Sequence, residues 1–297
     1  MKVLNYGSLN IDYVYQVDHF VRAGETLDSQ KLELFCGGKG LNQSIALSKS
    51  GVNVWHAGAV GENDSDMLLE LLNNSGVNTE YVKKKSGSSG HAIIQKTTNG
   101  ENCILLYGGA NQSITKEEVE ETLLHFDKGD FIILQNEISE ISYMIQRAHD
   151  KGMKIVFNPS PMNIKISAYP LDLVDYLLLN EVEGMEISRY PEANDELIKK
   201  LGEMYPNAKI VLTLGEKGSL YKDNDMLLRQ SIYQVKAVDT TAAGDTFTGF
   251  FLGAVLDGES IEKALDNAAK AAAIAVTREG AGASIPTKEE VETFHLW

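Results

Sequence analysis

The stretch VDTTAAGDTFTG at residues 238–249 places one carboxylate, Asp245, where small residues give way to the apolar run FFLGAVL. Residues 246–256 contain no proline and predict a helix, and the turn leading into it would consist of Ala242, Ala243 and Gly244. Backbone N–H groups at a helix start lack intrahelical acceptors, and the helix dipole makes the place attractive to anions. The sequence therefore predicts an anion-binding turn beside Asp245, although an aspartate at such a place, taken alone, is most often an N-cap.

These residue types suit phosphoryl transfer, which requires anion stabilisation, a divalent cation and a base directed at the attacking hydroxyl. The amides of the AAGD turn provide the first, Glu181 and Glu183 of NEVE are placed to organise Mg²⁺ through water, and Asp245 is the candidate base. A carboxylate is a weak base toward an alcohol, but a loose phosphoryl transition state needs little prior proton transfer. Neither a Walker A loop nor a Rossmann glycine motif follows the first strand, so the AAGD turn remains the candidate phosphate site.

The elements that must position these residues follow from alternating patterns along the chain. The expected strands are KVLNYG, VNVWHAGAV, FIILQ, KIVFN, YLLLN and KIVLTL, and the segments with helical spacing are residues 40–49, DMLLELLNN, ISYMIQRAHD and DELIKKLGEMY. Buried strands that alternate with helices predict a doubly wound, parallel α/β sheet. Because ligands of such sheets bind beyond the carboxyl ends of the strands, NEVE, TLGEKG and the AAGD turn are expected to face one crevice.

Two segments, residues 11–35 and 89–107, mix polar and β-forming residues without an intervening helix. We expect them to be antiparallel additions that form a small sheet, a lid over the site. Such strands leave exposed β edges, which proteins usually cover or pair, so a homodimer through the lid is expected. No repeat or linker divides the chain, which predicts a single domain over residues 1–297.

Composition excludes several classes of function. The 297 residues carry a formal charge of −15, which disfavours binding to nucleic acid phosphates. Cys36 and Cys103 form no metal-binding pair, and the six histidines occur singly and are assigned no chemistry. No signal peptide or membrane-spanning run is evident, so the chain is expected to be cytoplasmic.

Two long motifs resemble the signatures of one enzyme family. VDTTAAGDTFTG resembles the C-terminal signature of the PfkB carbohydrate kinases, and CGGKGLNQSIALSKSG resembles the N-terminal one. GGKG-x-NQ, the opening GSLNID and the ending AAAIAVTREGA are similar to the ribokinase branch, and the resemblance runs from about Asn5 to Pro286. It implies a three-layer α/β/α sandwich with a mostly parallel central sheet and a small β-sheet lid. It also implies ATP-dependent phosphorylation of the hydroxymethyl group of a pentose, D-ribose first.

The same resemblance implies roles for individual residues. The implied sugar ligands are Asn10, Asp12, Gly38, Lys39, Asn42 and Glu137. Asp245 would be the general base on the hydroxymethyl oxygen, and the anion hole would be formed by the amides of Ala242, Ala243 and Gly244. The residues implied on the Mg-ATP side are Asn180, Thr213, Gly215, Gly218, Gly244 and, reaching Mg²⁺ through water, Glu183. Ribokinases are activated by potassium beside the anion hole, and the matching residues here are Asp239, Thr241 and Ser284.

Some positions depart from the ribokinase pattern. Leu41 and Ser44 replace alanines of GGKGANQA and are interpreted as packing changes, NPSPMN replaces an NPAPA-like form, and Tyr107 is placed to narrow the sugar pocket. The substrate is therefore less defined than the reaction. The alternatives are another sugar such as deoxyribose or a modified ketose, a nucleoside, or a non-catalytic sugar-binding or regulatory protein that kept the fold.

Overall fold

The main sheet carries most of the described structure, which a computed structural model gives for residues 1–294; His295 lies outside the described residues. Its strands are β1 (Val3–Tyr6), β4 (Val54–Gly61), β5 (Asn78–Lys85), β8 (Phe131–Gln135), β9 (Lys154–Asn158), β10 (Tyr176–Asn180), β11 (Lys209–Thr213), β12 (Ser219–Lys222) and β13 (Leu227–Gln230). Among residues 1–294 they form a sheet in the order β13-β12-β11-β10-β9-β8-β1-β4-β5. All pairs are parallel except β11–β12 and β12–β13, which are antiparallel.

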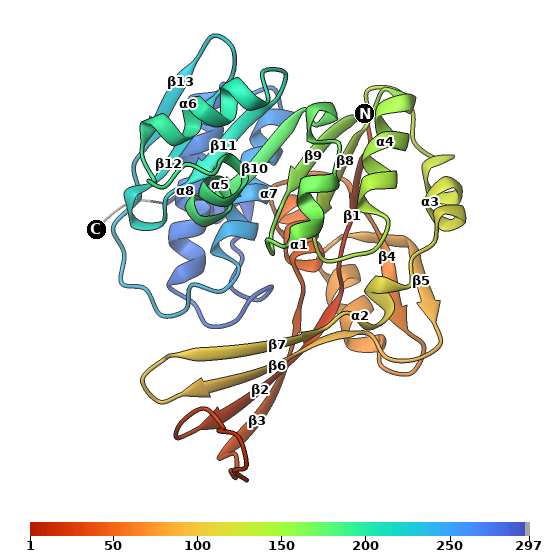
Figure 1. Ribbon diagram of the computed structural model, residues 1–297, viewed down its shortest axis with the longest axis vertical. Coiled ribbons are helices and arrows are strands. Elements are labelled where there is room, and N and C mark those ends of the chain that lie inside the picture. Colours follow the sequence, from red (N-terminus) through yellow and green to blue (C-terminus); the bar gives the residue numbers. More distant parts are fainter. Residues whose placement is uncertain (295–297) are drawn as a thin grey trace.

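Helices cover both faces of this sheet (Figure 1). One face packs against α1 (Lys39–Lys49), α2 (Asp66–Asn74), α7 (Ala243–Leu256) and α8 (Ile261–Val276). The other packs against α3 (Lys116–Leu123), α4 (Ile141–Lys151), α5 (Glu181–Ser188) and α6 (Asp195–Met204). The shorter elements are α9 (Lys288–Glu292), η1 (Gly109–Gln112), η2 (Ile164–Ala168), η3 (Leu171–Leu173) and η4 (Gly215–Lys217). No helix in the described part of the chain has the length and apolar character needed to cross a membrane.

The continuous apolar runs of the central strands follow from this covering. In β8, Ile132 and Leu134 pack into the core on the α3–α6 side, whereas Ile133 packs into the core under α1 and α7. A strand buried on both faces needs apolar residues at every position rather than at alternate ones. The predicted three-layer α/β/α sandwich with a mostly parallel sheet is confirmed.

A second sheet projects from the main body (Figure 1). Its strands, in the order β3-β2-β6-β7, are β3 (Lys31–Gly37), β2 (Asn10–Val17), β6 (Gly90–Thr97) and β7 (Asn102–Tyr107). The outer pairs are antiparallel, but the central pair β2–β6 is parallel, so the expectation of purely antiparallel additions is wrong. β2 follows β1 and β6 follows β5; these preceding strands run in the same direction, and each continuation leaves the main sheet at the same edge.

Strand register divides the side chains of the small sheet between its two faces. The residues in the same row as Asp12 are Phe35, Ala92 and Leu106. Tyr107 is one residue further and points to the opposite face, where its ring centroid lies 4.9 Å from that of His91. The expectation that Tyr107 narrows a sugar pocket beside Asp12 is therefore wrong, because successive strand residues face opposite sides.

Candidate active site

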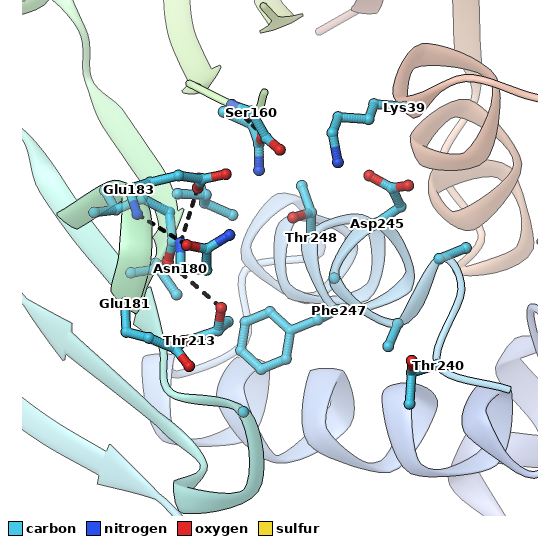
Figure 2. A pocket seen from close by; sticks show the side chains of 18 residues that line it. Lys39, Ser160, Asn180, Glu181, Glu183, Thr213, Thr240, Asp245, Phe247 and Thr248 are labelled. Atoms are coloured by element: carbon cyan, nitrogen blue, oxygen red, sulfur yellow. Dashed lines mark hydrogen bonds between the residues drawn. The ribbon is translucent and has the colours of Figure 1, made fainter. Parts of the chain in front are cut away.

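A cavity of about 340 Å³ opens where β10 and β11 end, beside the start of α7 (Figure 2). The sequence-predicted residues that line it are Lys39, Asn180, Glu181, Glu183, Thr213, Gly215, Ala242, Ala243, Gly244 and Asp245. Lys39 and Asp245 lie across the cavity from Asn180 and Glu183 (Figure 2). NEVE, the start of TLGEKG and the AAGD turn thus face one crevice, because parallel strands end at the same edge of a sheet.

Helix α7 begins three residues earlier than its sequence predicts, at Ala243. Ala242 takes the left-handed conformation, with φ at 60°, and turns the chain into the helix. The amide of Ala243 donates to the carbonyl of Thr240 at 3.3 Å, and within residues 1–294 the amides of Gly244 and Asp245 meet no acceptor. Of the three amides of the expected turn, only that of Ala243 meets an acceptor in the described structure, so the amides of Ala242 and Gly244, and that of Asp245 beyond the turn, are free to bind an anion.

The carboxylate of Asp245 is held by two side-chain amides. Asp245 is the third residue of α7 and not its N-cap, and it is only 7% exposed. Its Oδ2 accepts a hydrogen bond from Asn42 at 3.0 Å, and its Oδ1 accepts one from Gln43 at 2.9 Å. Gln43 was assigned no role from sequence, although it stands beside Asn42 in the GGKG-x-NQ motif. Both donors come from α1, which packs against α7.

Lys39, the first residue of α1, lies near three carboxylates of the site. Burial disfavours its charged form, but the carboxylates of Asp245, Glu137 and Glu183 outweigh this effect and raise the pKa of Lys39. Figure 2 shows its amino group directed into the cavity. Lys39 is therefore a cation at the junction between the cavity and the predicted sugar ligands.

The predicted sugar ligands beyond Lys39 include two carboxylates. Burial, with a smaller contribution from the charge of Glu137, raises the pKa of Asp12 to about 7. Asp12 lies over Gly37, where an added Cβ would come within 2.1 Å of its Oδ2. Glu137 accepts hydrogen bonds from the hydroxyl of Ser8 and, at 2.9 Å, from the amide of Lys39. One oxygen of Glu137 is thus engaged at the start of α1, while no hydrogen bond in the described structure holds the carboxylate of Asp12.

The neighbouring amides have defined orientations. Asn10 accepts through Oδ1 from Asn111 at 2.7 Å, so its NH2 group faces away from that bond. The Oδ1 of Asn42 is buried and has no hydrogen-bond partner in the described structure. Gly38 is the N-cap of α1 with φ at 96°, and a Cβ there would approach the Ser8 carbonyl to 3.0 Å. Gly38 is therefore needed for the backbone turn at the start of α1. Asn10 keeps an unpaired NH2 group, and Asn42 keeps an unpaired Oδ1, in the described structure.

On the opposite side of the cavity, two predicted residues form a capping box. Asn180 accepts from the amide of Glu183, and Glu183 accepts from the amide of Asn180, both at 2.9 Å. Gly215 lines the cavity with φ at 54°, but Gly218 does not. A Cβ at Gly218 would lie 2.1 Å from the carbonyl oxygen of Gln230. The glycine at 218 is required by this backbone contact with β13.

The residues expected to bind potassium lie on loops before and after α7 and α8. Asp239 accepts from the amide and hydroxyl of Thr241 at 2.9 and 2.6 Å, and from the amide of Gly280 at 3.3 Å. Ser284 is fully buried, and its hydroxyl donates to the carbonyl of Ala281. Within residues 1–294, no three His, Cys, Asp or Glu side chains are grouped so as to hold a metal ion.

Several residues in or beside the cavity were assigned no role from the sequence. Ser160, Phe247 and Thr248 line the cavity (Figure 2). Ser44, interpreted as a packing change, is instead a buried hydrogen-bonding residue whose hydroxyl pairs with His56 Nδ1 at 2.8 Å. Ser44 also accepts from Asn5, at 2.8 Å. Phe247 and Thr248 follow Asp245 within the VDTTAAGDTFTG motif, whereas only the fold shows that Ser160 lines the cavity and that Ser44 reaches Asn5 and His56.

The chain matches the model of the pfkB family carbohydrate kinases over residues 1–288. A ribokinase of Haemophilus influenzae is 33% identical over 298 residues, which cover 97% of this chain and 96% of the relative. A deoxyribokinase of Salmonella typhi is 29% identical over 303 residues, which cover 99% of this chain and 98% of the relative. The structure of Arabidopsis thaliana ribokinase complexed with ribose and ATP is 27% identical, covers 99% of each chain and has a TM-score of 0.88.

These similarities extend over nearly the whole chain, so they include the main sheet, the small sheet and the cavity between α1, α7 and β10. They confirm the ribokinase-like fold expected from the two motifs. They also confirm the reaction class, because the family model and the relatives are those of sugar kinases. The chain therefore belongs to the pfkB family of carbohydrate kinases.

Proposed function

We propose that this protein transfers the γ-phosphate of ATP to the hydroxymethyl oxygen of a pentose, D-ribose first. The observation that carries the proposal is the position of Lys39 and Asp245. Both line the cavity at the start of α7, and Glu137, on the side of the predicted sugar ligands, helps to raise the pKa of Lys39. A nucleotide in the cavity and a sugar against Asp12 and Glu137 would meet at these two residues. The ribokinase relatives support the same choice of substrates.

In this reaction Asp245 accepts the proton of the sugar hydroxymethyl group. The sugar oxygen forms a bond to the γ-phosphorus, the bond from that phosphorus to the β–γ bridging oxygen breaks, and ADP leaves. The free amides of Gly244 and Asp245 and the ammonium group of Lys39 stabilise the negative charge on the transferred group. Asp245 is only 7% exposed, so little water has to leave this residue when the substrates bind.

Magnesium would enter with the nucleotide and neutralise charge on its phosphates. Glu183 fits an indirect role, because one carboxylate oxygen is engaged by the amide of Asn180 and the side chain lines the cavity. Potassium is proposed at Asp239, the carbonyl of Thr241 and Ser284, an all-oxygen donor set. Replacing potassium by sodium in the assay is expected to lower kcat, and equal rates in the two salts would remove this assignment.

The polar groups near Lys39 favour a small polyol as acceptor. Asp12, Glu137, the NH2 group of Asn10 and the orphaned Oδ1 of Asn42 offer both acceptors and donors to sugar hydroxyls. One observation favours a nucleoside as the second candidate. Phe35 and Leu106, 40% and 50% exposed, share the face of the small sheet that carries Asp12, and could contact a base.

A homodimer is proposed through the small sheet. Its exposed apolar residues are Leu32, Leu34, Phe35, Ile93, Ile104, Leu105, Leu106 and Tyr107. β7 is an edge strand whose residues are all exposed, and such an edge is usually covered or paired. Light scattering after size exclusion is expected to give twice the chain mass of 32.6 kDa. A monomer mass at micromolar concentration would contradict the proposal.

The test of the function is ADP release by the purified protein with Mg-ATP and potassium. The acceptors are D-ribose, 2-deoxyribose, fructose, adenosine and none, and the expected result is the highest kcat/KM with D-ribose. A higher kcat/KM with adenosine or 2-deoxyribose would reassign the substrate. Absence of acceptor-dependent release with the whole panel, together with sugar binding by calorimetry, would favour a non-catalytic sugar-binding protein.

A further inference from the structure

A chain of buried side-chain amides runs from Asp245 into the interface between α1 and the main sheet. Gln43 donates to Asp245 Oδ1 at 2.9 Å, and Gln43 Oε1 accepts from Gln135 Nε2 at 2.7 Å. Gln135 Nε2 also donates to Asn5 Oδ1 at 2.9 Å. Asn5 in turn donates to the carbonyl of Gly40 at 2.7 Å. The chain therefore connects the carboxylate proposed as base to a backbone carbonyl of α1 through three amides.

The register of the sheet places these residues on one face. Asn5 on β1 is in register with Ile133 on β8, and Gln135 lies two residues further along β8 on that same face. This face packs against α1, which carries Gln43. The amides meet across the sheet–helix interface, although Gln43 and Gln135 are separated by 92 residues in the sequence.

The Gly40 carbonyl at one end of the chain and the Asp245 carboxylate at the other can only accept, and together they fix which way every amide points. A carbonyl can only accept, so the Asn5 group facing it must be the NH2, which leaves Asn5 Oδ1 to accept from Gln135. Both acceptors of Gln135 Nε2 are then amide oxygens, and Gln43 must turn its NH2 toward Asp245. The Gly40 carbonyl thus requires the same orientation of Gln43 as the Asp245 carboxylate does.

Stability alone does not account for this chain. Asn5, Gln43 and Gln135 have no exposed surface, and the same interface contains the fully buried apolar residues Leu41 and Ile45. Burial of amides costs free energy that their hydrogen bonds only offset, and apolar side chains of similar shape can be as stable. The polar residues therefore point to a role at the carboxylate they reach.

We propose that Gln43 and Gln135 are positioning residues that hold the Asp245 carboxylate in one orientation toward the sugar hydroxyl. Asn42 holds the second oxygen from the adjacent position of α1, so rotation of the carboxylate is restricted at both oxygens. Gln135 acts only through Gln43, since it makes no hydrogen bond to Asp245. This inference rests on the proposed function, in which Asp245 is the base.

The first experiment compares Gln43→Met and Gln135→Met with the full-length protein in steady-state assays with D-ribose. Methionine has a similar length but lacks the amide. We expect kcat to fall about 100-fold in Gln43→Met and about 10-fold in Gln135→Met, because a misplaced reacting group costs up to about 100-fold. KM for both substrates is expected to stay within about threefold, a range chosen well below that loss. An unchanged kcat in Gln43→Met would overturn the proposal.

The double variant distinguishes positioning from a general loss of packing. If Gln135 acts through Gln43, the Gln43→Met, Gln135→Met protein has the kcat of Gln43→Met alone. If the two losses in kcat multiply in the double variant, Gln135 does not act through Gln43, and the proposal is contradicted. Ser44→Ala is the matched control, because Ser44 is also fully buried but accepts only the second NH2 hydrogen of Asn5, so the Asn5 bonds to the Gly40 carbonyl and to Gln135 are expected to remain. Its kcat is expected to be that of the wild type, and a loss like that of Gln135→Met would also contradict the proposal.

A measurement without turnover separates this inference from the proposed function and remains available if a variant folds poorly. In the wild-type protein, NMR of the side-chain amides is expected to show slowly exchanging Nε2 protons for Gln43. Faster exchange of these protons is expected in Gln135→Met and in Asp245→Ala. Rapid exchange of the Gln43 amide protons in the wild type would overturn the positioning role of Gln43 and Gln135, even if D-ribose is phosphorylated. If these protons exchange slowly but the wild type phosphorylates no acceptor, the positioning of Asp245 is retained and the proposed kinase function is rejected.

Discussion

Two aspartates with different proposed roles stand in different parts of the molecule. Asp245 stands in the first turn of α7, packed on the main sheet, and its two oxygens accept hydrogen bonds from Asn42 and Gln43. Asp12 stands on β2 of the small sheet, where no described hydrogen bond holds it and burial raises its pKa to about 7. One carboxylate is oriented before any substrate arrives. The other lacks partners that sugar hydroxyls could supply.

The contrast fits the different tasks proposed for the two regions. A base must be held at a fixed place relative to the transferred phosphoryl group, and the buried α1–α7 interface provides this. A sugar ligand must exchange its partner at every turnover, and a partly accessible small sheet allows it. Disruption near Asp245 should therefore affect the rate, whereas disruption at Asp12 should affect binding.

The largest expected effect is that of Asp245→Asn. The amide cannot accept the hydroxyl proton, so kcat should fall by about 100- to 10,000-fold, the range of general base catalysis. Calorimetry with ATP should show nearly unchanged affinity, because the free amide of Gly244 and the capping box of Asn180 remain. A rate near that of the wild type would end the assignment of Asp245 as base.

A smaller effect is expected from Asp12→Ala. Loss of hydrogen bonds to a charged group, about 1.5–3 kcal/mol, should raise KM for D-ribose about 10- to 100-fold. Both kcat and KM for ATP should stay close to the wild-type values, as measured by initial rates at saturating concentrations of the other substrate. A variant impaired only in its use of ATP would refute the placement of Asp12 on the sugar side.

The smallest effect concerns stability and pH. The pKa of Asp12 is about 7 in the folded protein and 3.8 as its ordinary value, so between these pH values the folded state binds more protons and stability falls as pH rises. Asp12→Asn removes this titration. After allowance for solvent screening, urea unfolding should show a decline between pH 5 and pH 8 that is about 1–2 kcal/mol smaller in the variant. Equal declines would contradict the burial of Asp12.

Much of the fold could be predicted because central strands such as FIILQ and KIVFN are nearly continuous apolar runs. The parallel pairing of β2 with β6 could not, since these strands are distant in sequence and no local pattern specifies their direction. The start of α7 was missed because Ala242 has φ at 60°, a conformation that alanine rarely adopts and that its sequence does not signal.

The candidate site divides in the same way. Lys39 and Asp245 could be predicted because each stands in a long motif. Gln43 stands in the same motif as Lys39, but its partner Gln135 lies outside both motifs, and only the fold shows that the two glutamines meet. Gly38 and Gly218 have backbone roles that depend on close approach to the Ser8 and Gln230 carbonyls.

The most direct test of a sugar hydroxymethyl group facing Asp245 is the position of the phosphate in the product. Phosphorus NMR of the product from D-ribose and ATP, recorded without proton decoupling, reports which carbon bears the phosphoryl oxygen. Coupling to the two methylene protons of the hydroxymethyl carbon is the predicted result. Coupling to the single anomeric proton would contradict it, because a different hydroxyl would then face Asp245.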